Sequence, residues 1–303
     1  MKPLVSVIIP TYNRANTVAR TINCVLSQTY DHFEIIVVDD GSTDNTVSIL
    51  KQFSDNRIKI VFHDVNKGVT AAKNTGLDNI KGEWFTILDS DDEIVPEALE
   101  TLMKIPLEFD TSVDAVTCNC IDTSTNSFGG SGMDTDQYVD FKTMMNVKGE
   151  FWGVIKTTLL LNDRFNPLLA GFEATLWYKI DEKAKRYYIH KALRIFHTEG
   201  DDRVSNYSRT GTKISRHFQV LSSETHYLNN MKKYLPDTFA KNCLNAVIYL
   251  VIDKKKDYAR FYYQQLKTLS NYRLYKVVSY LVINTNSFIV ASGVRLMVKF
   301  KIL

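Results

Sequence analysis

The stretch GEWFTILDSDD, residues 82–92, runs from an apolar segment directly into three aspartates within four residues. Residues 84–88 have the length and composition of a buried strand. Adjacent carboxylates repel one another and lose hydration unless a cation joins them. Mg²⁺ and Mn²⁺ prefer such oxygen ligands and keep coordination positions open for phosphate oxygens. The stretch therefore favours a strand ending at a metal site. The alternative is that Asp91 or Asp92 caps the helix that follows.

Upstream of this stretch, strand patterns alternate with helix patterns. Short β-branched runs indicate buried strands, and apolar residues at helical spacing indicate helices. The predicted strands are Val5–Ile9, Phe33–Val38 and Ile58–Phe62, and the predicted helices are about 15–28, 44–50 and 70–78. Such alternation implies a parallel sheet with helices on both faces, in which ligands bind at the carboxyl ends of the strands.

Beyond about Asp110 the pattern is less regular. A strand is predicted over 114–120, partly helical segments over 152–161 and 175–180, and helices from about Lys213 onward. We therefore expect an α/β domain over residues 1–212, with halves at 1–110 and 111–212, and a helical region over 213–303.

Composition narrows the class of protein. A chain of 303 residues with 45% hydrophobic and 12% aromatic content is folded rather than disordered. Four cysteines are too few for a disulfide scaffold, and Cys118 and Cys120 are expected to be buried free thiols in a reducing compartment. No targeting segment is visible, and no apolar run reaches the roughly 20 residues that span a bilayer.

The charge is distributed unevenly along the chain. Residues 251–303 carry ten Lys and Arg against two Asp, a net of +8, which leaves −5 for residues 1–250. The basic end also contains many aromatic residues and two apolar stretches, 277–283 and 288–298. Basic, aromatic, amphipathic segments suit the interface of an anionic membrane. A helical cap on the catalytic domain and a dimer interface are the alternatives.

Two further segments, VSVIIPTYNR (5–14) and EIIVVDDGSTDNT (34–46), are apolar runs ending in polar residues. Tyr12 could stack on a nucleobase, Asp40 could accept a hydrogen bond from a pyrimidine imide, and the loop 39–42 could meet a ribose. For either segment alone, the polar residues are explained equally well by an ordinary strand-to-helix turn, in which Asn, Asp, Gly and Ser are common.

Taken together, five segments decide between these interpretations. VSVIIPTYNR, VVDDGSTDNT, NKGVTAAKNTGL, GEWFTILDSDD and AGFEATLW occur in this order. The series resembles the family 2 inverting glycosyltransferases of GT-A fold, over about residues 4–205. The resemblance implies a sugar transferred from a nucleoside-diphosphate donor, with UDP favoured, to a hydroxyl of a glycan or lipid-linked acceptor in cell-envelope polysaccharide synthesis. It also implies a cytoplasmic location at the inner face of the membrane.

The resemblance assigns roles to particular residues. The donor-binding positions it implies are Thr11, Tyr12, Asn13, Asp39, Asp40, Lys73, Asp89 and Ser90. Lys73 stands where the family usually has Arg, so the charge is kept but the bidentate fork is lost. Mn²⁺ or Mg²⁺ would be held by Asp89 and Asp91, with His197 as a late ligand or a structural residue. Arg203 is expected to pair with a neighbouring aspartate, with a phosphate as the alternative.

The implied catalytic base departs from the family pattern. The family commonly has a Glu-Asp pair shortly before a Leu-Trp-like pair, and here those positions hold Phe172 and Glu173. Glu173 is then the base that takes the proton of the acceptor hydroxyl. The alternative is a structural Glu173 that bonds a nearby amide or arginine.

Other functions remain open. The missing acid also fits a nucleotide-sugar-binding protein that lacks transfer or needs a partner chain, and a homodimer is a further option. A nucleotidyltransferase would need a glycine-rich triphosphate loop, but PTYNRANT, residues 10–17, contains no glycine. No nucleic-acid partner is expected.

Overall fold

The computed structural model describes residues 2–197 and 211–299. The chain divides into two compact units, residues 1–200 and 201–303, and each is described by itself. This division lies earlier than the boundary after residue 212 that the sequence suggested.

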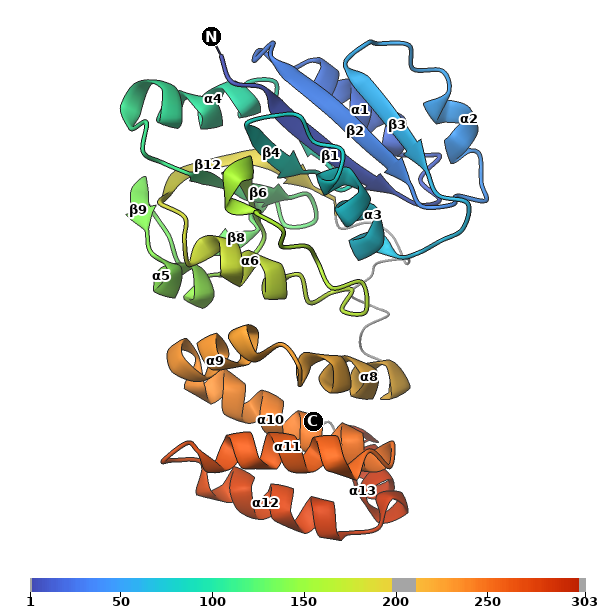
Figure 1. The fold of residues 1–303 in the computed structure, drawn as a ribbon, viewed down its shortest axis with the longest axis vertical. Helices are drawn as coiled ribbons and strands as arrows, with labels where there is room; N and C mark the ends of the chain where they lie inside the picture. Colours follow the sequence, from blue (N-terminus) through green and yellow to red (C-terminus); the bar gives the residue numbers. More distant parts are fainter. Residues whose placement is uncertain (1, 198–210, 300–303) are drawn as a thin grey trace. The chain divides into compact units, whose positions relative to one another are not determined.

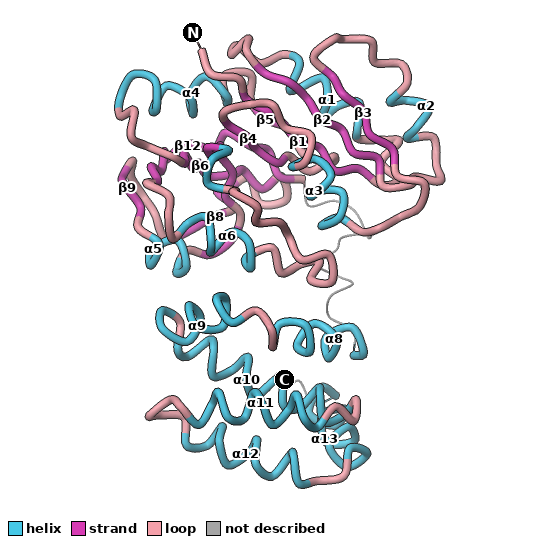
Figure 2. Tube along the Cα trace, in the orientation of Figure 1, coloured by secondary structure: helices cyan, strands magenta, loops and turns pink. Residues whose placement is uncertain are grey.

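The first unit is built on one mixed sheet with strand order β3-β2-β1-β4-β11-β6-β12-β5 (Figures 1 and 2). The strands β1 (Val5–Thr11), β2 (Phe33–Asp39), β3 (Ile58–Phe62) and β4 (Trp84–Ile87) are mutually parallel. Strand β11 (Phe151–Lys156) runs antiparallel between β4 and β6 (Ala115–Asp122). Strand β12 (Arg186–Phe196) pairs with β6 in parallel and with the short β5 (Glu93–Ile94) in antiparallel orientation.

Smaller elements complete this unit. The minor strands are β7 (Ser127–Phe128), β8 (Gly130–Ser131), β9 (Gln137–Val139) and β10 (Lys148–Gly149). The helices are α1 (Val18–Leu26), α2 (Thr46–Leu50), α3 (Val69–Leu77), α4 (Ala98–Lys104), α5 (Phe141–Asn146) and α6 (Ala174–Asp181). A π-helical turn (Ile105–Phe109) follows α4, and a 3₁₀ turn (Thr157–Leu159) follows β11.

The central strands are buried on both faces, which explains their uninterrupted apolar composition. Side chains alternate along β1, so Val7 and Ile9 pack in the core that contains α1. Ile8, between them, packs in a second core with Ala72 of α3 and Leu176 of α6. The sheet thus carries a hydrophobic core on each face, as the alternation of strands and helices predicted.

Most of the predicted elements are confirmed, including the buried free thiols of Cys118 and Cys120. The partly helical interpretation of 152–161 is wrong for residues 152–156, which belong to β11 at the centre of the sheet. A short apolar run carries no signal that separates a buried strand from a helix, and here the neighbouring strands decide. The cap interpretation is also wrong, because α4 begins at Ala98 and its N-cap residue is Glu97.

The second unit is helical, as predicted. Its helices are α8 (Gly211–Leu221), α9 (Thr225–Tyr234), α10 (Pro236–Ile252), α11 (Lys256–Lys267), α12 (Arg273–Asn284) and α13 (Ser287–Lys299) (Figure 1). Its core is formed by buried residues of α10, such as Cys243 and Val247, and of α11, such as Tyr262 and Leu266. Among the helices of the described ranges, none has both the length and the apolar character needed to cross a membrane.

Candidate active site

The carboxyl ends of β1 and β2 present two buried polar atoms without protein partners. Thr11 and Asp39 are paired in the register of the two parallel strands. Among the described residues, neither Thr11 Oγ1 nor Asp39 Oδ1 has a hydrogen-bond partner, although both atoms are buried. The other oxygen of Asp39 accepts from the backbone N–H of Ser42 at 3.1 Å. Buried polar atoms in proteins are almost always paired, so this end of the sheet is suited to a polar ligand.

Asp40 has a different environment from its neighbour. Its Oδ1 lies 2.6 Å from His63 Nδ1 and accepts from the backbone N–H of Lys67 at 3.0 Å. Its Oδ2 accepts from the N–H of Gly68 at 2.7 Å, at the start of α3. Asp40 therefore holds the turn before α3, and the oxygen without a partner belongs to Asp39. The expected contact between Asp40 and a base stays a prediction. Sequence reasoning missed His63, because nothing local marks it as the partner of Asp40.

Asn13 connects the loops that follow β1 and β2. Its backbone is in the left-handed region, at φ 50°, which asparagine tolerates better than most residues. Its N–H donates to Ser42 Oγ at 2.9 Å, and its Oδ1 accepts from the N–H of Thr43 at 2.8 Å. These bonds fix the loop on which the neighbouring Tyr12 ring is exposed. Tyr12 is thus available to stack on a base.

The aspartates after β4 divide into one buried and two accessible carboxylates. Asp92 is fully buried and paired with Arg194 of β12, whose Nε donates to Asp92 Oδ2 at 2.8 Å. The side chains of Asp89 and Asp91 are 44% and 38% exposed. Arg194 also lies 3.2 Å from Asp89, and Arg14 lies 3.4 Å from Asp91. Ser90, between the two accessible aspartates, is buried.

The charges around this loop set its protonation. Loss of solvent acts to raise the pKa of Asp89, but the cations Lys73, Arg194 and Arg14 outweigh it and hold the pKa below its ordinary value. Burial raises the pKa of Asp92 to about 6, against the attraction of Arg194. Asp89 is therefore a carboxylate at neutral pH, the form that a divalent cation requires.

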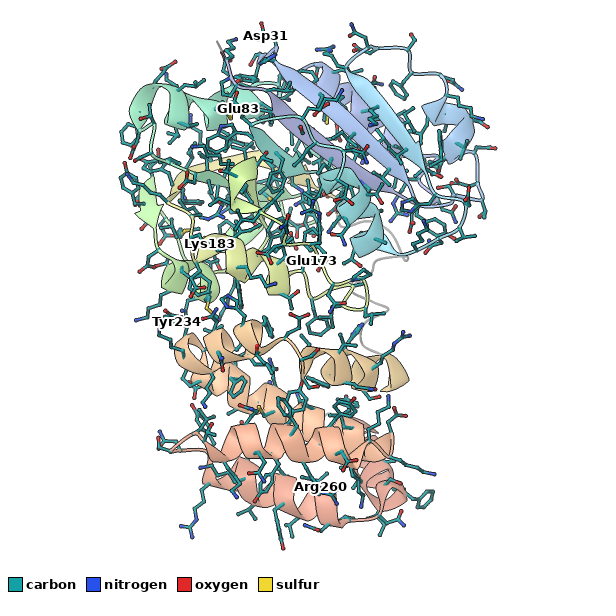
Figure 3. All side chains as sticks on the ribbon, in the orientation of Figure 1. Asp31, Glu83, Glu173, Lys183, Tyr234 and Arg260 are labelled. Atoms are coloured by element: carbon teal, nitrogen blue, oxygen red, sulfur yellow. The ribbon has the colours of Figure 1, made fainter. Side chains whose placement is uncertain are left out.

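Glu173 and Lys73 lie together although they are far apart in the sequence. Lys73 is on α3, and Glu173 is the N-cap residue of α6 (Figure 3). Their side chains approach to 3.6 Å between Lys73 Nζ and Glu173 Oε1, and both are largely buried. Asn74 fixes the segment that leads to Glu173, because its amide exchanges hydrogen bonds of 2.8 and 2.9 Å with the backbone of Phe165. The predicted base thus lies beside the predicted diphosphate-binding cation.

His197 lies at the end of β12 beside the acidic loop. Its backbone N–H donates to Asp92 Oδ1 at 3.0 Å, and its ring Nε2 lies 2.9 Å from Glu93 Oε1. Within residues 2–197 and 211–299, no three His, Cys, Asp or Glu side chains form a group able to hold a metal ion. Metal binding by His197 with Asp89 and Asp91 therefore stays a prediction. Arg203 lies outside the described residues.

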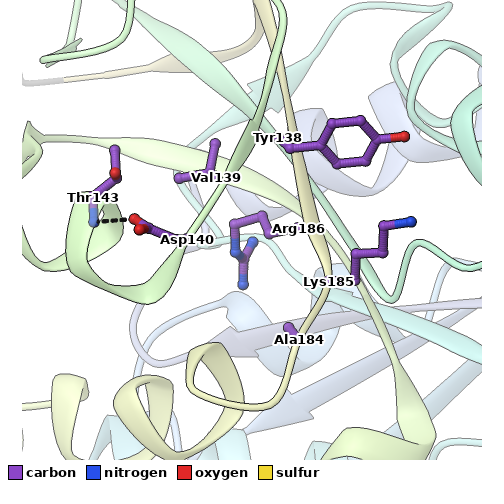
Figure 4. Close-up of a pocket in the computed structure, with 7 residues that line it drawn as sticks. All are labelled: Tyr138, Val139, Asp140, Thr143, Ala184, Lys185 and Arg186. Atoms are coloured by element: carbon purple, nitrogen blue, oxygen red, sulfur yellow. Dashed lines mark hydrogen bonds between the residues drawn. The ribbon is translucent and has the colours of Figure 1, made fainter.

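A pocket at another edge of this unit contains none of the predicted site residues. Figure 4 shows its lining of Tyr138, Val139, Asp140, Thr143, Ala184, Lys185 and Arg186. The cations in it have protein partners, since Arg186 pairs with Asp181 and Lys185 pairs with Asp110. The other predicted donor residues lie instead at or just after the ends of β1, β2 and β4, Lys73 lies on α3, and Glu173 lies at the start of α6.

Known proteins match both the sequence and the fold. The chain is 39% identical over 212 residues to the GalNAc(5)-diNAcBac-PP-undecaprenol beta-1,3-glucosyltransferase of Campylobacter jejuni, covering 67% of each protein. It is 33% identical over 177 residues to the UDP-Glc:alpha-D-GlcNAc-diphosphoundecaprenol beta-1,3-glucosyltransferase WfgD of Escherichia coli, covering 58% of this chain and 69% of that protein. Several other relatives match over less than half of their own length.

The fold matches the crystal structure of S. aureus TarS 1-349 in complex with UDP-GlcNAc, with a TM-score of 0.68 and 18% identity. That match covers 97% of this chain and 92% of the TarS chain. It confirms the GT-A fold with a helical C-terminal region. The family described as "Glycosyl transferase family 2" matches residues 6–160, slightly more than half of the sequence. The chain therefore belongs to glycosyl transferase family 2.

Proposed function

We propose that this glycosyltransferase moves a sugar from a UDP-sugar, or another nucleoside-diphosphate sugar, to a hydroxyl of a glycan or lipid-linked acceptor in cell-envelope polysaccharide synthesis. One observation carries the proposal. The unpaired Asp39 Oδ1, the accessible Asp89 and Asp91, and Lys73 of α3 belong to loops and a helix that follow the parallel strands β2, β4 and β3, and Glu173 of a distant segment pairs with Lys73. The names of the relatives above support the donor and acceptor classes.

In this proposal each part of the donor meets a different strand end. The base stacks on Tyr12 and hydrogen-bonds to Thr11 and Asp39, which both have buried atoms without partners. The ribose and diphosphate lie toward Asp89, Ser90 and Lys73. A bound Mn²⁺ or Mg²⁺ would neutralise the departing diphosphate. The carboxylates of Asp89 and Asp91 fit such an ion, since they are oxygen ligands, are accessible and are close to neighbouring cations that keep Asp89 ionised.

The transfer itself needs one proton acceptor. Glu173 takes the proton of the acceptor hydroxyl while its oxygen attacks the anomeric carbon. The bond from that carbon to the diphosphate oxygen breaks on the opposite face, so the nucleoside diphosphate leaves and the configuration is inverted. Phe172 stands where a second acid is usual, and Glu173 performs this step alone.

We also propose that the helical C-terminal region makes peripheral contact with the inner face of the cell membrane. The excess of basic and aromatic residues in that region supports this. A homodimer that uses the same region is the second candidate.

The first experiment is a thermal-shift screen with UDP and UDP-sugars, with and without Mn²⁺. A donor at about 100 times its dissociation constant stabilises the folded state by about 2.7 kcal/mol. We expect the shift to require metal and to disappear in Asp91→Ala. The control Asp31→Ala removes an exposed aspartate that precedes β2, at the end of the sheet opposite the site (Figure 3). Equal shifts in both variants would contradict the role of Asp91.

Transfer separates the enzyme from a binding protein that has lost catalysis. We expect Glu173→Gln to retain the donor-dependent shift and to lose transfer to the acceptor. Donor binding by the unaltered protein without transfer to any acceptor of a broad panel would favour the degenerate or partner-dependent interpretation.

A further inference from the structure

The outward side of α12 is apolar. Leu274 and Leu281 are 70% and 57% exposed, and Val277 and Tyr280 are also exposed. Residues 274, 277 and 281 share one side of a helix, because they follow the spacing i, i+3, i+7. The opposite side carries the buried Ser279 and Ile283 and packs on α10 and α11. An ordinary surface helix has apolar residues only on the side that faces the core, whereas α12 has them on its exposed side as well.

The patch continues into the next helix. Phe288 and Ile289, at the start of α13, are 76% and 62% exposed. Only Thr285 and Asn286 separate the two helices. We call these exposed residues the α12–α13 face: Leu274, Val277, Tyr280, Leu281, Phe288 and Ile289. An exposed apolar patch built from several large side chains marks an interaction surface.

The basic residues near the α12–α13 face indicate which kind of partner it binds. Residues 258–303 contain seven Lys and Arg and no Asp or Glu. Arg273 is exposed at the first turn of α12. The whole unit 201–303 carries 17 Lys and Arg against six Asp and Glu, a net of +11. An apolar patch with a basic surround complements an anionic lipid surface, where apolar side chains insert and cations meet headgroups.

A second copy of the chain fits this face less well. A two-fold interface brings the same patch of both copies together. Such an interface would bring the basic residues of both copies, including Arg273 and Lys276, onto one surface. The segment 258–303 contains no Asp or Glu, and Asp237 of α10, which accepts a hydrogen bond from the Tyr272 hydroxyl, is one carboxylate near the start of α12. Like charges brought together disfavour such an interface, so charge separates the two candidates.

We infer that the α12–α13 face docks on an anionic lipid bilayer, with α12 lying in the plane of the interface. The inference deepens the proposed membrane contact by assigning it to particular residues, and it rests on that proposal. Docking would restrict the enzyme to the surface on which a lipid-linked acceptor resides. This raises the effective concentration of that acceptor without any new contact at the active site.

The test is co-sedimentation of the full chain with vesicles. We expect binding to vesicles of phosphatidylcholine with about one third phosphatidylglycerol, and weaker binding to phosphatidylcholine alone. The double variant Leu274→Ser/Leu281→Ser should lower the partition coefficient by about tenfold or more, because two apolar side chains no longer insert. Arg273→Gln should lower it about fivefold on anionic vesicles only. The matched control Leu161→Ser changes a comparably exposed leucine of residues 2–197 and should bind normally.

A tryptophan introduced at one position distinguishes loss of membrane contact from misfolding of the variant. Tryptophan in Leu281→Trp should be quenched by brominated lipid, whereas tryptophan in Leu161→Trp should not. Unaltered binding of the double variant, or quenching of both tryptophans alike, would overturn the inference. So would a concentration-dependent dimer of the unaltered chain that the double variant abolishes, since a second copy would then cover the face.

Failure of this inference and failure of the proposed function give different results. Vesicle binding is measured without donor or acceptor, and the donor-dependent thermal shift is measured without lipid. Vesicle binding without a donor shift would contradict the proposed function alone. A donor shift with no vesicle binding would contradict the docking surface and the proposed membrane contact, and would leave the proposed donor binding and sugar transfer unaffected.

Discussion

At the scale of single residues, Lys73 and Glu173 form an ion pair in the described structure. In the proposed function, the diphosphate of a donor would compete with Glu173 for the same ammonium group. Donor binding would therefore draw Lys73 away and leave the carboxylate free to accept a proton. The proposal therefore predicts separable kinetic roles for the two residues, one in donor binding and one in transfer.

We predict that Glu173→Gln lowers kcat by about 10²–10⁴, the range for a lost general base, with little change in donor affinity.

We predict that Lys73→Met mainly raises the donor KM. Lys73→Arg should retain most of the affinity for the donor, because guanidinium also binds phosphate. Steady-state kinetics at varied donor concentration measures both. The control Lys179→Met removes another cation. Lys179 is on α6, and its Nζ lies 3.0 Å from Oδ1 of Asp163. A donor KM unchanged in Lys73→Met would be evidence against the diphosphate contact.

The four cysteines offer a second prediction at this scale. Burial raises the pKa of Cys24 to about 11, and that of Cys120 and of Cys243 to about 12. Burial also raises the pKa of Cys118 well above its usual range. Thiols attack as thiolates, so all four should react slowly with Ellman's reagent at pH 8 in the folded protein. Four thiols should react rapidly in guanidinium chloride, and a rapid native thiol would refute the burial argument.

At the scale of elements, α3 packs closely on β1 through Gly76. A Cβ at Gly76 would lie 2.3 Å from Cγ2 of the fully buried Ile8. Alanine usually favours a helix over glycine by about 1 kcal/mol, but a core clash costs about 1–3 kcal/mol. The clash should dominate here.

We therefore predict that Gly76→Ala lowers the free energy of unfolding. Gly293→Ala in α13 is the matched control, because nothing lies within 4 Å of its added Cβ. It should be neutral or stabilising by up to about 1 kcal/mol. Urea unfolding of both variants makes the comparison. An equal change in the two would show that helix propensity, and not packing on β1, sets the outcome.

Arg194 joins β12 to the acidic loop through the buried Asp92. Breaking a buried ion pair on one side typically costs about 3–5 kcal/mol, because the remaining charge is left uncompensated. We predict such a loss for Arg194→Met. The double variant Arg194→Met/Asp92→Asn should recover part of it, since the amide can still accept the N–H of His197. If denaturant unfolding shows no recovery, the loss arises from packing rather than from charge.

At the scale of the whole molecule, the two units carry opposite charge. Residues 1–200 have 20 Lys and Arg against 28 Asp and Glu, a net of −8, whereas residues 201–303 have a net of +11. The overall charge of +3 conceals this division. An anionic surface would therefore attract the helical unit and repel the unit that contains the predicted donor site.

We predict that binding to anionic vesicles weakens steeply between 0.1 and 1 M NaCl, because the screening length falls from about 10 to about 3 Å. Residual binding at high salt should depend on the α12–α13 face and be lost in Leu274→Ser/Leu281→Ser. Sedimentation across a salt series measures both. Salt-independent binding by the unaltered chain would show that charge makes no contribution.

The sequence by itself determined the elements of the first hundred residues and the helical character of the last hundred. Strands such as β1 and β2 are local runs of β-branched residues, and their polar ends are visible in the same few residues. The spacing of apolar residues likewise suffices for α1. These are properties of neighbouring residues, so no knowledge of distant contacts was needed. The order of the five segments then identified the family and the fold.

Only the tertiary structure decided which of the polar residues act together. The sequence of strand β11 does not distinguish it from a helix, because its hydrogen-bonding partners, β4 and β6, lie elsewhere in the chain. The aspartates after β4 look equivalent in the sequence, yet Arg194, 102 positions from Asp92, separates the buried one from the accessible ones. Hydrogen bonds and ion pairs between distant residues leave no local pattern, because they depend on how the strands are ordered across the sheet.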